Sequence, residues 1–274
     1  MKKIGFVDYY ISEWHANNYP AWMAEISDEY KVSYVWAEKD DSPVDGVTTA
    51  QWCEKFGAQQ CQTLEELCEK SDVIVILSPG FPEKHLPYAK VVLPYGKRTY
   101  IDKTFSPDLT EAKEIFALAQ QYGTPFFSTS ALRYSEELNT VENCRHIVTS
   151  GSGRSADEYI VHQAEMIVKK LGFGAEAIRC EGDASLYTFR IRYSDDRSAT
   201  MLFSSAYPFS VYMVGDTSRF AEVKSPFFQN LIADMIRFFE EGTVSFDPAE
   251  TLEVMKIREG AMKSTLSPGE WITL

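Results

Sequence analysis

Short apolar runs alternate with amphipathic stretches through the first half of the chain. Five runs have the length and composition of strands, and they cover 3–7, 31–37, 72–78, 98–102 and 124–130. Helical patterns fall between them, at 21–30, 49–57, 63–71, in a short stretch after 79–85, and at 108–122. The run 72–78 is apolar through its centre, as expected of a strand buried on both faces. Strands that alternate with helices predict a doubly wound α/β domain with a parallel sheet.

The second half has a different pattern. A helix is predicted over 155–171, followed by strand-like runs at 176–182, 185–194, 198–206 and 209–216. The links 194–198 and 206–208 have the composition of hairpin turns. Two further helices are expected, one ending at Gly242 and one opening near Asp247. We therefore predict a Rossmann-like domain over 1–125 and an α+β domain with a mostly antiparallel sheet over 126–274, which would bind substrate and form oligomer contacts.

Charge and cysteine content narrow the class of protein. The 274 residues carry a net charge of −13 without a basic stripe, which argues against a nucleic acid or an anionic membrane as partner. The five cysteines are odd in number and form no C-x-x-C pair, so reduced thiols are expected and a metal cluster is not. No apolar run approaches the roughly 20 residues of a membrane span. We expect a cytoplasmic protein.

The first candidate for chemistry is Asp102-Lys103-Thr104, at the carboxyl end of a predicted strand. Ligands of open α/β sheets bind outside the carboxyl ends of the strands. Lys103 could serve there as an acid or donate a hydrogen bond to a substrate oxygen, with Asp102 holding its ammonium. The alternative is a solvated lysine that pairs loosely with its neighbour.

The second candidate lies on the helix predicted over 155–171. Glu158, His162, Glu165 and Lys169 share one narrow face by their spacing of three and four residues. A carboxylate at Glu158 could orient the imidazole of His162 and raise its basicity. The alternative is an exposed face of weak ion pairs. Because no third ligand accompanies this pair, we predict no metal site.

These motifs carry a family resemblance. The order of DVIVILSP, then GKRTYIDKTFSPDLTEAKEIFALAQQYG, then an Arg-Tyr pair resembles the glucose–fructose oxidoreductase/inositol dehydrogenase/MocA (Gfo/Idh/MocA) oxidoreductase family. The resemblance implies a Rossmann domain followed by an α/β domain with a large antiparallel sheet, and a tendency to form homo-oligomers. It also implies catalytic roles for Lys103, His162 and Glu158, and NAD or NADP as cofactor. It implies that Glu38, Ser78, Pro79 and His85 would bind that cofactor. It also implies that Arg133 and Tyr134 would bind the substrate.

The turn after the first strand departs from the family pattern. A G-x-G-x-x-G fingerprint is expected there, but its three glycine positions hold Asp8, Tyr10 and Glu13. Each glycine lets the backbone approach a pyrophosphate or pack closely, whereas a ring or a carboxylate at that point opposes the phosphate by bulk or by charge. The following residues are rich in aromatic and hydrogen-bonding groups that suit a sugar or polyol, and those assigned to substrate are Tyr10, Trp14, His15 and Asn17. The alternative is that these aromatic side chains only pack the loop onto the domain.

Three functions remain open from the sequence. The first is a nicotinamide-dependent oxidoreductase that acts on a sugar, inositol or related polyol. The second is a lyase, isomerase or epimerase for a carbohydrate-like substrate that works on the same scaffold without a nicotinamide. The third is a non-catalytic relative that binds a ligand. Apolar residues over 185–216 predict a homo-oligomer in all three cases.

Overall fold

The computed structural model describes residues 1–274, and the chain forms two compact units. The first unit contains 1–129 and 231–248, and the second contains 130–230 and 249–274. The chain first passes from one unit to the other between 129 and 130, close to the division expected between 125 and 126. The return of 231–248 to the first unit has no counterpart in that expectation.

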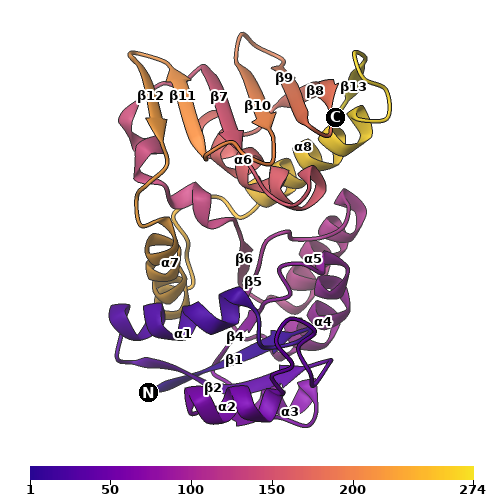
Figure 1. The fold of residues 1–274 in the computed structure, drawn as a ribbon. Helices are drawn as coiled ribbons and strands as arrows, with labels where there is room; N and C mark the ends of the chain where they lie inside the picture. Colours follow the sequence, from indigo (N-terminus) through magenta and orange to yellow (C-terminus); the bar gives the residue numbers. More distant parts are fainter. The chain divides into compact units, whose positions relative to one another are not determined.

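The first unit is built on a six-stranded parallel sheet (Figure 1). Its strand order is β3-β2-β1-β4-β5-β6, the order of dinucleotide-binding Rossmann domains. The prediction of a doubly wound parallel sheet is confirmed. The strands are β1 (Lys2–Asp8), β2 (Tyr30–Ala37), β3 (Gln59–Gln60), β4 (Val73–Ile76), β5 (Thr99–Ile101) and β6 (Phe126–Ser128).

Helices connect these strands and cover both faces of the sheet. Gly5 and Phe6 of β1 point to opposite faces because side chains alternate along a strand. A Cβ on Gly5 would meet Leu67 of α3, so the glycine allows that helix to approach, whereas Phe6 contacts Trp52 of α2. The helices are α1 (Trp14–Ile26), α2 (Thr49–Phe56), α3 (Leu64–Lys70), η1 (Pro82–Lys84), α4 (His85–Val92), η2 (Leu93–Tyr95) and α5 (Leu109–Tyr122).

Two of these helices show how well local signals mark an end. Helix α5 begins after Asp108, whose carboxylate accepts from the Glu111 amide, and ends at Gly123 with φ 63°, both as predicted. Helix α1 begins at Trp14, seven residues before the predicted start at Ala21. Glu13 caps it, and glutamate is not among the residues preferred at that position.

The segment 231–248 returns to the first unit through α7 (Phe227–Glu241). The ring of Phe238 packs 4.9 Å from that of Phe127 on β6. Arg98 donates to the carbonyl oxygens of Phe239 and Glu240 at 2.6 and 2.8 Å, which satisfies acceptors at the carboxyl end of the helix.

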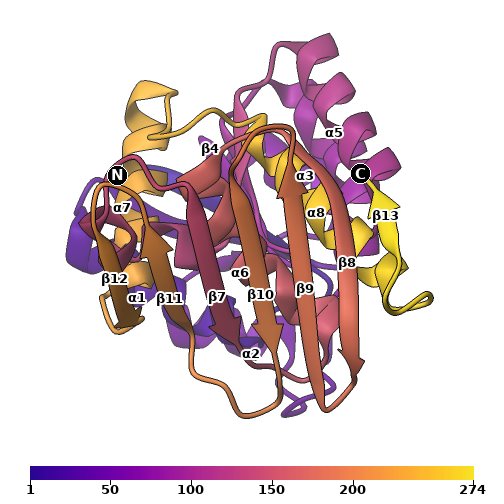
Figure 2. The ribbon, with the colours of Figure 1, turned by 90° about the horizontal axis from the view of Figure 1, so that it is seen from above.

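The second unit is a seven-stranded sheet with helices on one face (Figure 2). The strand order is β12-β11-β7-β10-β9-β8-β13, in which β7 and β10 run parallel and the other neighbours are antiparallel. The strands are β7 (His146–Gly151), β8 (Ala175–Asp183), β9 (Leu186–Tyr193), β10 (Ser198–Phe203), β11 (Ser210–Val214), β12 (Ser218–Glu222) and β13 (Trp271–Thr273). The predicted α+β half with a mostly antiparallel sheet is confirmed.

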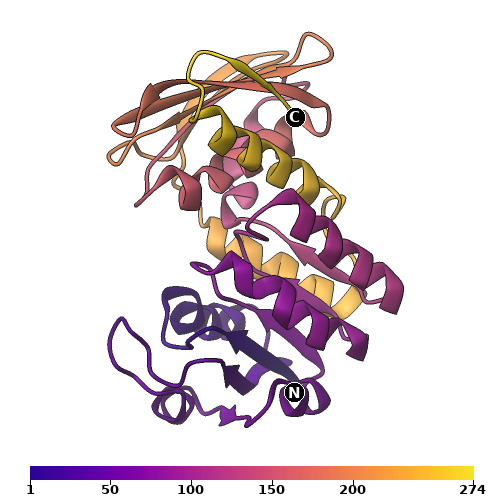
Figure 3. The same ribbon diagram turned by 90° about the vertical axis from the view of Figure 1, so that its right-hand side faces the viewer.

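Helices α6 (Ala156–Leu171) and α8 (Glu250–Ser264) cover that one face, and α8 is the yellow helix beneath the sheet in Figure 3. The apolar side of α6 lies in the core of this unit, with Ile160, Ala164 and Ile167 fully buried. The short 3-10 helices η3 (Ala131–Tyr134) and η4 (Glu136–Thr140) precede β7.

One predicted hairpin is wrong. The link 194–198 does join the antiparallel neighbours β9 and β10, but the link 206–208 does not join neighbours. Strand β7 lies between β10 and β11. The chain leaves β7 through α6 and returns beside it as β10, because a parallel pair needs a long crossover. The polar residues of His146–Gly151 hid this central strand from the apolar pattern.

No helix of the structure is both long and apolar enough to cross a membrane. All five cysteines are free thiols and buried. No group of three or more His, Cys, Asp or Glu side chains is arranged to hold a metal ion.

Candidate functional site

The start of α1 lies directly after the first strand, at the carboxyl edge of the parallel sheet. The Glu13 carboxylate accepts from the backbone amides of His15, at 2.8 Å, and of Ala16. These first-turn amides carry the positive end of the helix dipole and are otherwise available to anions. Burial raises the pKa of Glu13, against the opposing charge of His15.

Asp8 ends β1 and is buried beside this turn. Its Oδ1 accepts from the Tyr9 amide at 2.7 Å and from the Ser78 hydroxyl at 3.1 Å, and its Oδ2 has no hydrogen-bond partner. Burial, and next the negative charge of Glu13, raise the pKa of Asp8 well above its usual value. An unsatisfied buried carboxylate oxygen is costly to the fold, so its presence at a strand end points to a functional site.

His15 and Asp102 join α1 to β5 by a buried contact between Nδ1 and Oδ2. The other oxygen of Asp102 accepts from the Tyr100 hydroxyl at 3.0 Å and from the Lys103 amide at 2.8 Å. Burial raises the pKa of Asp102, but the charge and hydrogen bond of His15 outweigh it and hold this pKa below its usual value. An ionised carboxylate therefore orients the imidazole, an arrangement common to general acid–base sites.

Lys103 stands next to this pair at the carboxyl end of β5, where the sequence placed a functional lysine. Its ammonium donates to the Pro79 carbonyl oxygen at 3.3 Å. Ser78 and Pro79 follow β4, and Ser78 has a positive φ of 66°. Predicted catalytic and cofactor residues from β4 and β5 thus meet at one edge of the sheet.

Two other residues assigned to a cofactor are engaged within the protein. His85 is fully buried, with Nδ1 3.0 Å from the Phe105 carbonyl oxygen and Nε2 2.6 Å from that of Leu77. Both ring nitrogens thus face backbone carbonyls, and the side chain ties α4 to the sheet. Glu38, which follows β2, accepts from Lys84 at 2.6 Å and from the Tyr88 hydroxyl at 2.8 Å.

Aromatic side chains gather around the same strand ends. The ring of Tyr9 lies 4.5 Å from that of Phe81 and 6.0 Å from that of Tyr10. Trp14 is 52% exposed, while His15 beside it stacks on the buried ring of Tyr19. Part of the aromatic set therefore packs the loop, and Trp14 and Tyr10 retain surface that a ligand can reach.

Asn17 has a structural role in this loop. Its side-chain oxygen accepts from the indole nitrogen of Trp52 at 2.9 Å, and its amide nitrogen donates to Ser12 at 3.4 Å. The residue links α1 to α2.

In the second unit, His162 of α6 is held by a residue that the sequence did not suggest. Its Nδ1 lies 2.6 Å from the Ser130 hydroxyl. The carboxylate of Glu158 forms an ion pair with Arg154, four residues earlier and largely exposed. The ring and the acid that the family pattern pairs therefore have different partners in this structure.

Arg133 is buried between two carboxylates. Its Nε donates to Glu165 and its Nη1 to Glu250, both at 2.8 Å. Glu165 also accepts from the Ser130 amide at 3.1 Å. The alternative interpretation of an exposed face of weak ion pairs does not hold for Glu165, which is buried and paired with Arg133. Tyr134, the other residue of the Arg-Tyr pair, accepts from Asn230 through its carbonyl oxygen.

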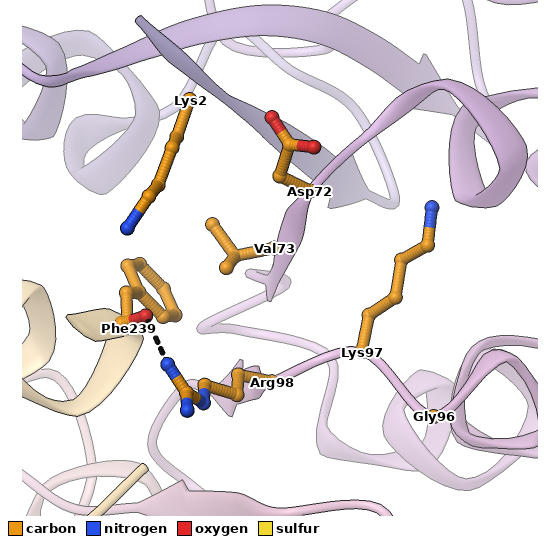
Figure 4. Close-up of a pocket in the computed structure, with 7 residues that line it drawn as sticks. All are labelled: Lys2, Asp72, Val73, Gly96, Lys97, Arg98 and Phe239. Atoms are coloured by element: carbon orange, nitrogen blue, oxygen red, sulfur yellow. Dashed lines mark hydrogen bonds between the residues drawn. The ribbon is translucent and has the colours of Figure 1, made fainter. Parts of the chain in front are cut away.

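A surface pocket opens at the opposite edge of the first sheet (Figure 4). Most of the residues that line it lie where β1 and β4 begin and just before β5. They are Lys2, Asp72, Val73, Gly96, Lys97, Arg98 and Phe239. Its cations already have partners, since Lys97 donates to the carbonyl oxygens of Cys68 and Ser71 and Arg98 to α7. The pocket lies away from the strand ends where Rossmann domains bind ligands.

The turn between β1 and α1 does not fit the pyrophosphate of a nicotinamide cofactor in the usual pose. A Rossmann domain offers bare first-turn amides and glycines to that group. Here those amides hold the Glu13 carboxylate, and Asp8 adds a second acid, which is buried. We therefore derive no reaction step through a nicotinamide.

Comparisons with known proteins agree with the fold. Residues 17–130 match the model of the Gfo/Idh/MocA family, described as an oxidoreductase family with an NAD-binding Rossmann fold. A stretch of 66 residues is 38% identical to the uncharacterized oxidoreductase YhhX of Escherichia coli strain K12; it covers 23% of this chain and 19% of that protein.

Solved structures resemble the whole chain at low identity. A probable dehydrogenase from Thermotoga maritima aligns with a TM-score of 0.79 and 12% identity, over 99% of this chain and 98% of the other. An oxidoreductase from Agrobacterium radiobacter in complex with NAD+, L-tartaric acid and magnesium aligns with a TM-score of 0.77 and 10% identity, over 99% and 98%. At these identities the likeness concerns the fold.

Proposed function

We propose that the chain is an enzyme of the Gfo/Idh/MocA family of oxidoreductases, whose model residues 17–130 match, and that it acts on a hydroxyl or carbonyl group of a sugar, an inositol or a related polyol. The observation that carries this proposal is the buried His15–Asp102 pair at the end of β5, directly before Lys103, whose ammonium reaches the Pro79 carbonyl oxygen after β4. In open α/β sheets this edge is where ligands bind.

The residues at this edge can move protons at a substrate oxygen. The ammonium of Lys103 can donate a hydrogen bond or a proton to a carbonyl oxygen, or stabilise an alkoxide. With Nδ1 of His15 on Asp102, the imidazole would exchange its proton through Nε2. The family resemblance adds His162 as acid or base and Glu158 as its partner, a role for which Ser130 is the structural candidate.

The substrate class is proposed from the side chains around the loop. The exposed ring of Trp14 and the half-buried ring of Tyr10 offer apolar faces to the C–H groups of a sugar, and His15 supplies hydrogen bonding. Asn17 would act on substrate only indirectly, through the loop that it fixes. Arg133 and Tyr134 would likewise shape their surroundings, since Arg133 is already bound by two carboxylates.

The proposed enzyme could work in two ways, which differ in whether a nicotinamide cofactor takes part. NAD or NADP would accept or supply a hydride when bound, and Glu38, Ser78, Pro79 and His85 would be its neighbours by resemblance. The position of Glu13 on the first-turn amides favours the other form, a lyase, isomerase or epimerase that needs proton transfer alone. A ligand-binding relative without turnover is the third form.

We also propose a homo-oligomer that uses the uncovered face of the seven-stranded sheet. Tyr212 and Phe220 are 44% and 66% exposed on neighbouring strands β11 and β12. Figure 2 shows no helix over this face of the strands. Exposed aromatic side chains on one sheet face are typical of a protein–protein contact. Light scattering of the purified chain tests this.

The test of function is a substrate screen with and without added nicotinamide cofactors. Sugars, inositols and polyols are incubated with the wild type, with Lys103→Met and with Lys113→Met, an exposed lysine of α5. We expect Lys103→Met to lower kcat/KM by about 10²–10⁴-fold, the usual contribution of a proton-transfer group, and Lys113→Met to retain it. Full activity in Lys103→Met would contradict the proposal. Saturable polyol binding with no product in any reaction would indicate the non-catalytic relative.

A further inference from the structure

The amino end of α1 occupies the place where a dinucleotide-binding domain holds its cofactor phosphates. In this chain a side chain of the protein itself occupies that place. Glu13 is the residue before the helix, and its two carboxylate oxygens accept from the amides of His15 and Ala16. A carboxylate on these amides makes the same kind of contact as a phosphate oxygen.

We propose that the Glu13 carboxylate is a built-in substitute for the cofactor phosphate, so that this turn excludes NAD and NADP. The proposal concerns the cofactor of the enzyme proposed above and does not depend on which substrate is converted. It predicts that the site gains dinucleotide binding when the carboxylate is removed.

A second acid strengthens the exclusion. Asp8 is 1% exposed at the end of β1, and one of its oxygens has no hydrogen-bond partner. Glu13 accepts from the His15 amide and the His15 ring contacts Asp102, so these two acids flank the start of α1 beside Asp8 at the end of β1. A diphosphate would bring further negative charge into that region, against like charges that water does not screen.

The adenosine side of the site is closed as well. Glu38 stands after β2, where a dinucleotide-binding domain places the acid that binds the ribose. Its two oxygens are held by Lys84 and Tyr88. The ammonium of Lys84 also lies 4.7 Å from the centre of the Tyr9 ring, and Tyr9 packs on Phe81. Residues after β1, β2 and β4 thus bind one another where the cofactor would lie.

The experiment restores the missing fingerprint. Asp8, Tyr10 and Glu13 occupy its three glycine positions, so Asp8→Gly/Tyr10→Gly/Glu13→Gly recreates G-x-G-x-x-G. Isothermal titration and nicotinamide fluorescence are recorded with NAD⁺, NADH, NADP⁺ and NADPH. We expect no saturation of the wild type below about 1 mM, and affinity for at least one nucleotide raised by about tenfold or more in the triple variant.

A single substitution keeps the test decisive if the triple variant does not fold. Glu13→Ser retains a favourable helix cap but removes the carboxylate and its volume. We expect it to bind inorganic pyrophosphate, or one of the four nucleotides, at least about tenfold more tightly than the wild type. The matched control is Asp108→Ser, which changes the cap of α5 and should gain nothing.

Two results would overturn the proposal. One is saturable binding of a nicotinamide nucleotide to the wild type at micromolar concentration. The other is a folded Glu13→Ser protein that binds pyrophosphate and all four nucleotides no better than the wild type. Neither result bears on substrate turnover, which the Lys103→Met comparison tests separately.

Discussion

Each unit buries a cluster of charged side chains, and the two clusters differ in how fully their charges are paired. In the second unit Arg133 lies between Glu165 and Glu250, 2.8 Å from each. In the first unit Asp8 and Glu13 accept hydrogen bonds from backbone amides and from Ser78 and form no ion pair, and the Asp8 carboxylate keeps an oxygen without a hydrogen bond. Carboxylates that share a buried cation fix the packing around them, whereas a buried carboxylate oxygen without a partner retains an electrostatic cost that a ligand or a reaction can relieve.

The pKa values of the acids in the first unit are also shifted in different directions. Burial raises the pKa of both Asp8 and Glu13, and for Asp8 the charge of Glu13 adds to this rise. Asp102, equally buried, has its pKa lowered because His15 and then Lys103 stabilise its charge. Neighbouring groups whose pKa values are pushed in opposite directions are typical of sites that transfer protons. Together with the contact between His15 and Asp102, these directions support the chemistry proposed for this cluster, whereas we propose a structural role for that of Arg133.

The largest effect should come from removing the cation that the two glutamates of the second unit share. Arg133→Met leaves Glu165 and Glu250 buried without their cation, and we expect a loss of about 3–5 kcal/mol in the free energy of unfolding. Urea unfolding measures it. The control Arg154→Met removes an exposed partner of Glu158 and should cost about 0–1 kcal/mol. A similarly small cost for Arg133→Met would show that its cluster contributes little to the fold.

A smaller effect, of opposite sign, is expected at Asp8 in the first unit. Asp8→Asn removes a buried carboxylate whose second oxygen is unsatisfied, and should raise the free energy of unfolding by about 1–2 kcal/mol at pH 8. The pKa of Asp8 is higher in the folded chain than in the unfolded one. The wild type therefore loses stability as pH rises above about 4 toward the folded pKa, and the variant lacks this loss.

The gain from Asp8→Asn should accordingly be smaller at pH 5 than at pH 8, which urea unfolding at both values resolves. Asp72→Asn, at an exposed turn, serves as the control and should give no gain at pH 8. A loss of stability in Asp8→Asn at pH 8 would mean that the charge of Asp8 is favourable.

Much of the fold could be predicted because its signals are local. The apolar run over 72–78 and the stops at Gly123 and Gly172 predicted elements that the structure contains. Strand β7 escaped because half of its residues are polar, and the start of α1 escaped because its cap is an unusual glutamate. The local pattern of apolar residues does not show which neighbouring strands a polar strand pairs with.

The candidate site was predictable only in part, since its contacts join distant residues. Lys103 was proposed from its place at a strand end and from the family resemblance, but the contact between His15 and Asp102 spans 87 residues of chain. The burial of Glu165 depends on Arg133, which lies on a different element. Helical spacing fixed the face on which an acid stands and could not supply its partner.

The smallest effect separates the two candidate partners of His162. Ser130→Ala removes the hydroxyl 2.6 Å from its Nδ1, and should lower kcat/KM on the substrate found by the screen by roughly threefold to tenfold, as for one lost hydrogen bond. Glu158→Gln removes only an ion pair on the helix surface and should change the free energy of unfolding by about 0.2–0.5 kcal/mol.

A spectroscopic measurement makes this comparison independent of turnover. The ¹⁵N shift of the His162 Nδ1 should move in Ser130→Ala, because the atom bound to that nitrogen is gone, and should stay in place in Glu158→Gln. The opposite pattern would return Glu158 to the orienting role that the family resemblance gives it. In that case the ion pair with Arg154 would be the exchangeable contact, and the second unit would hold an acid–base pair of its own in addition to the Arg133 cluster.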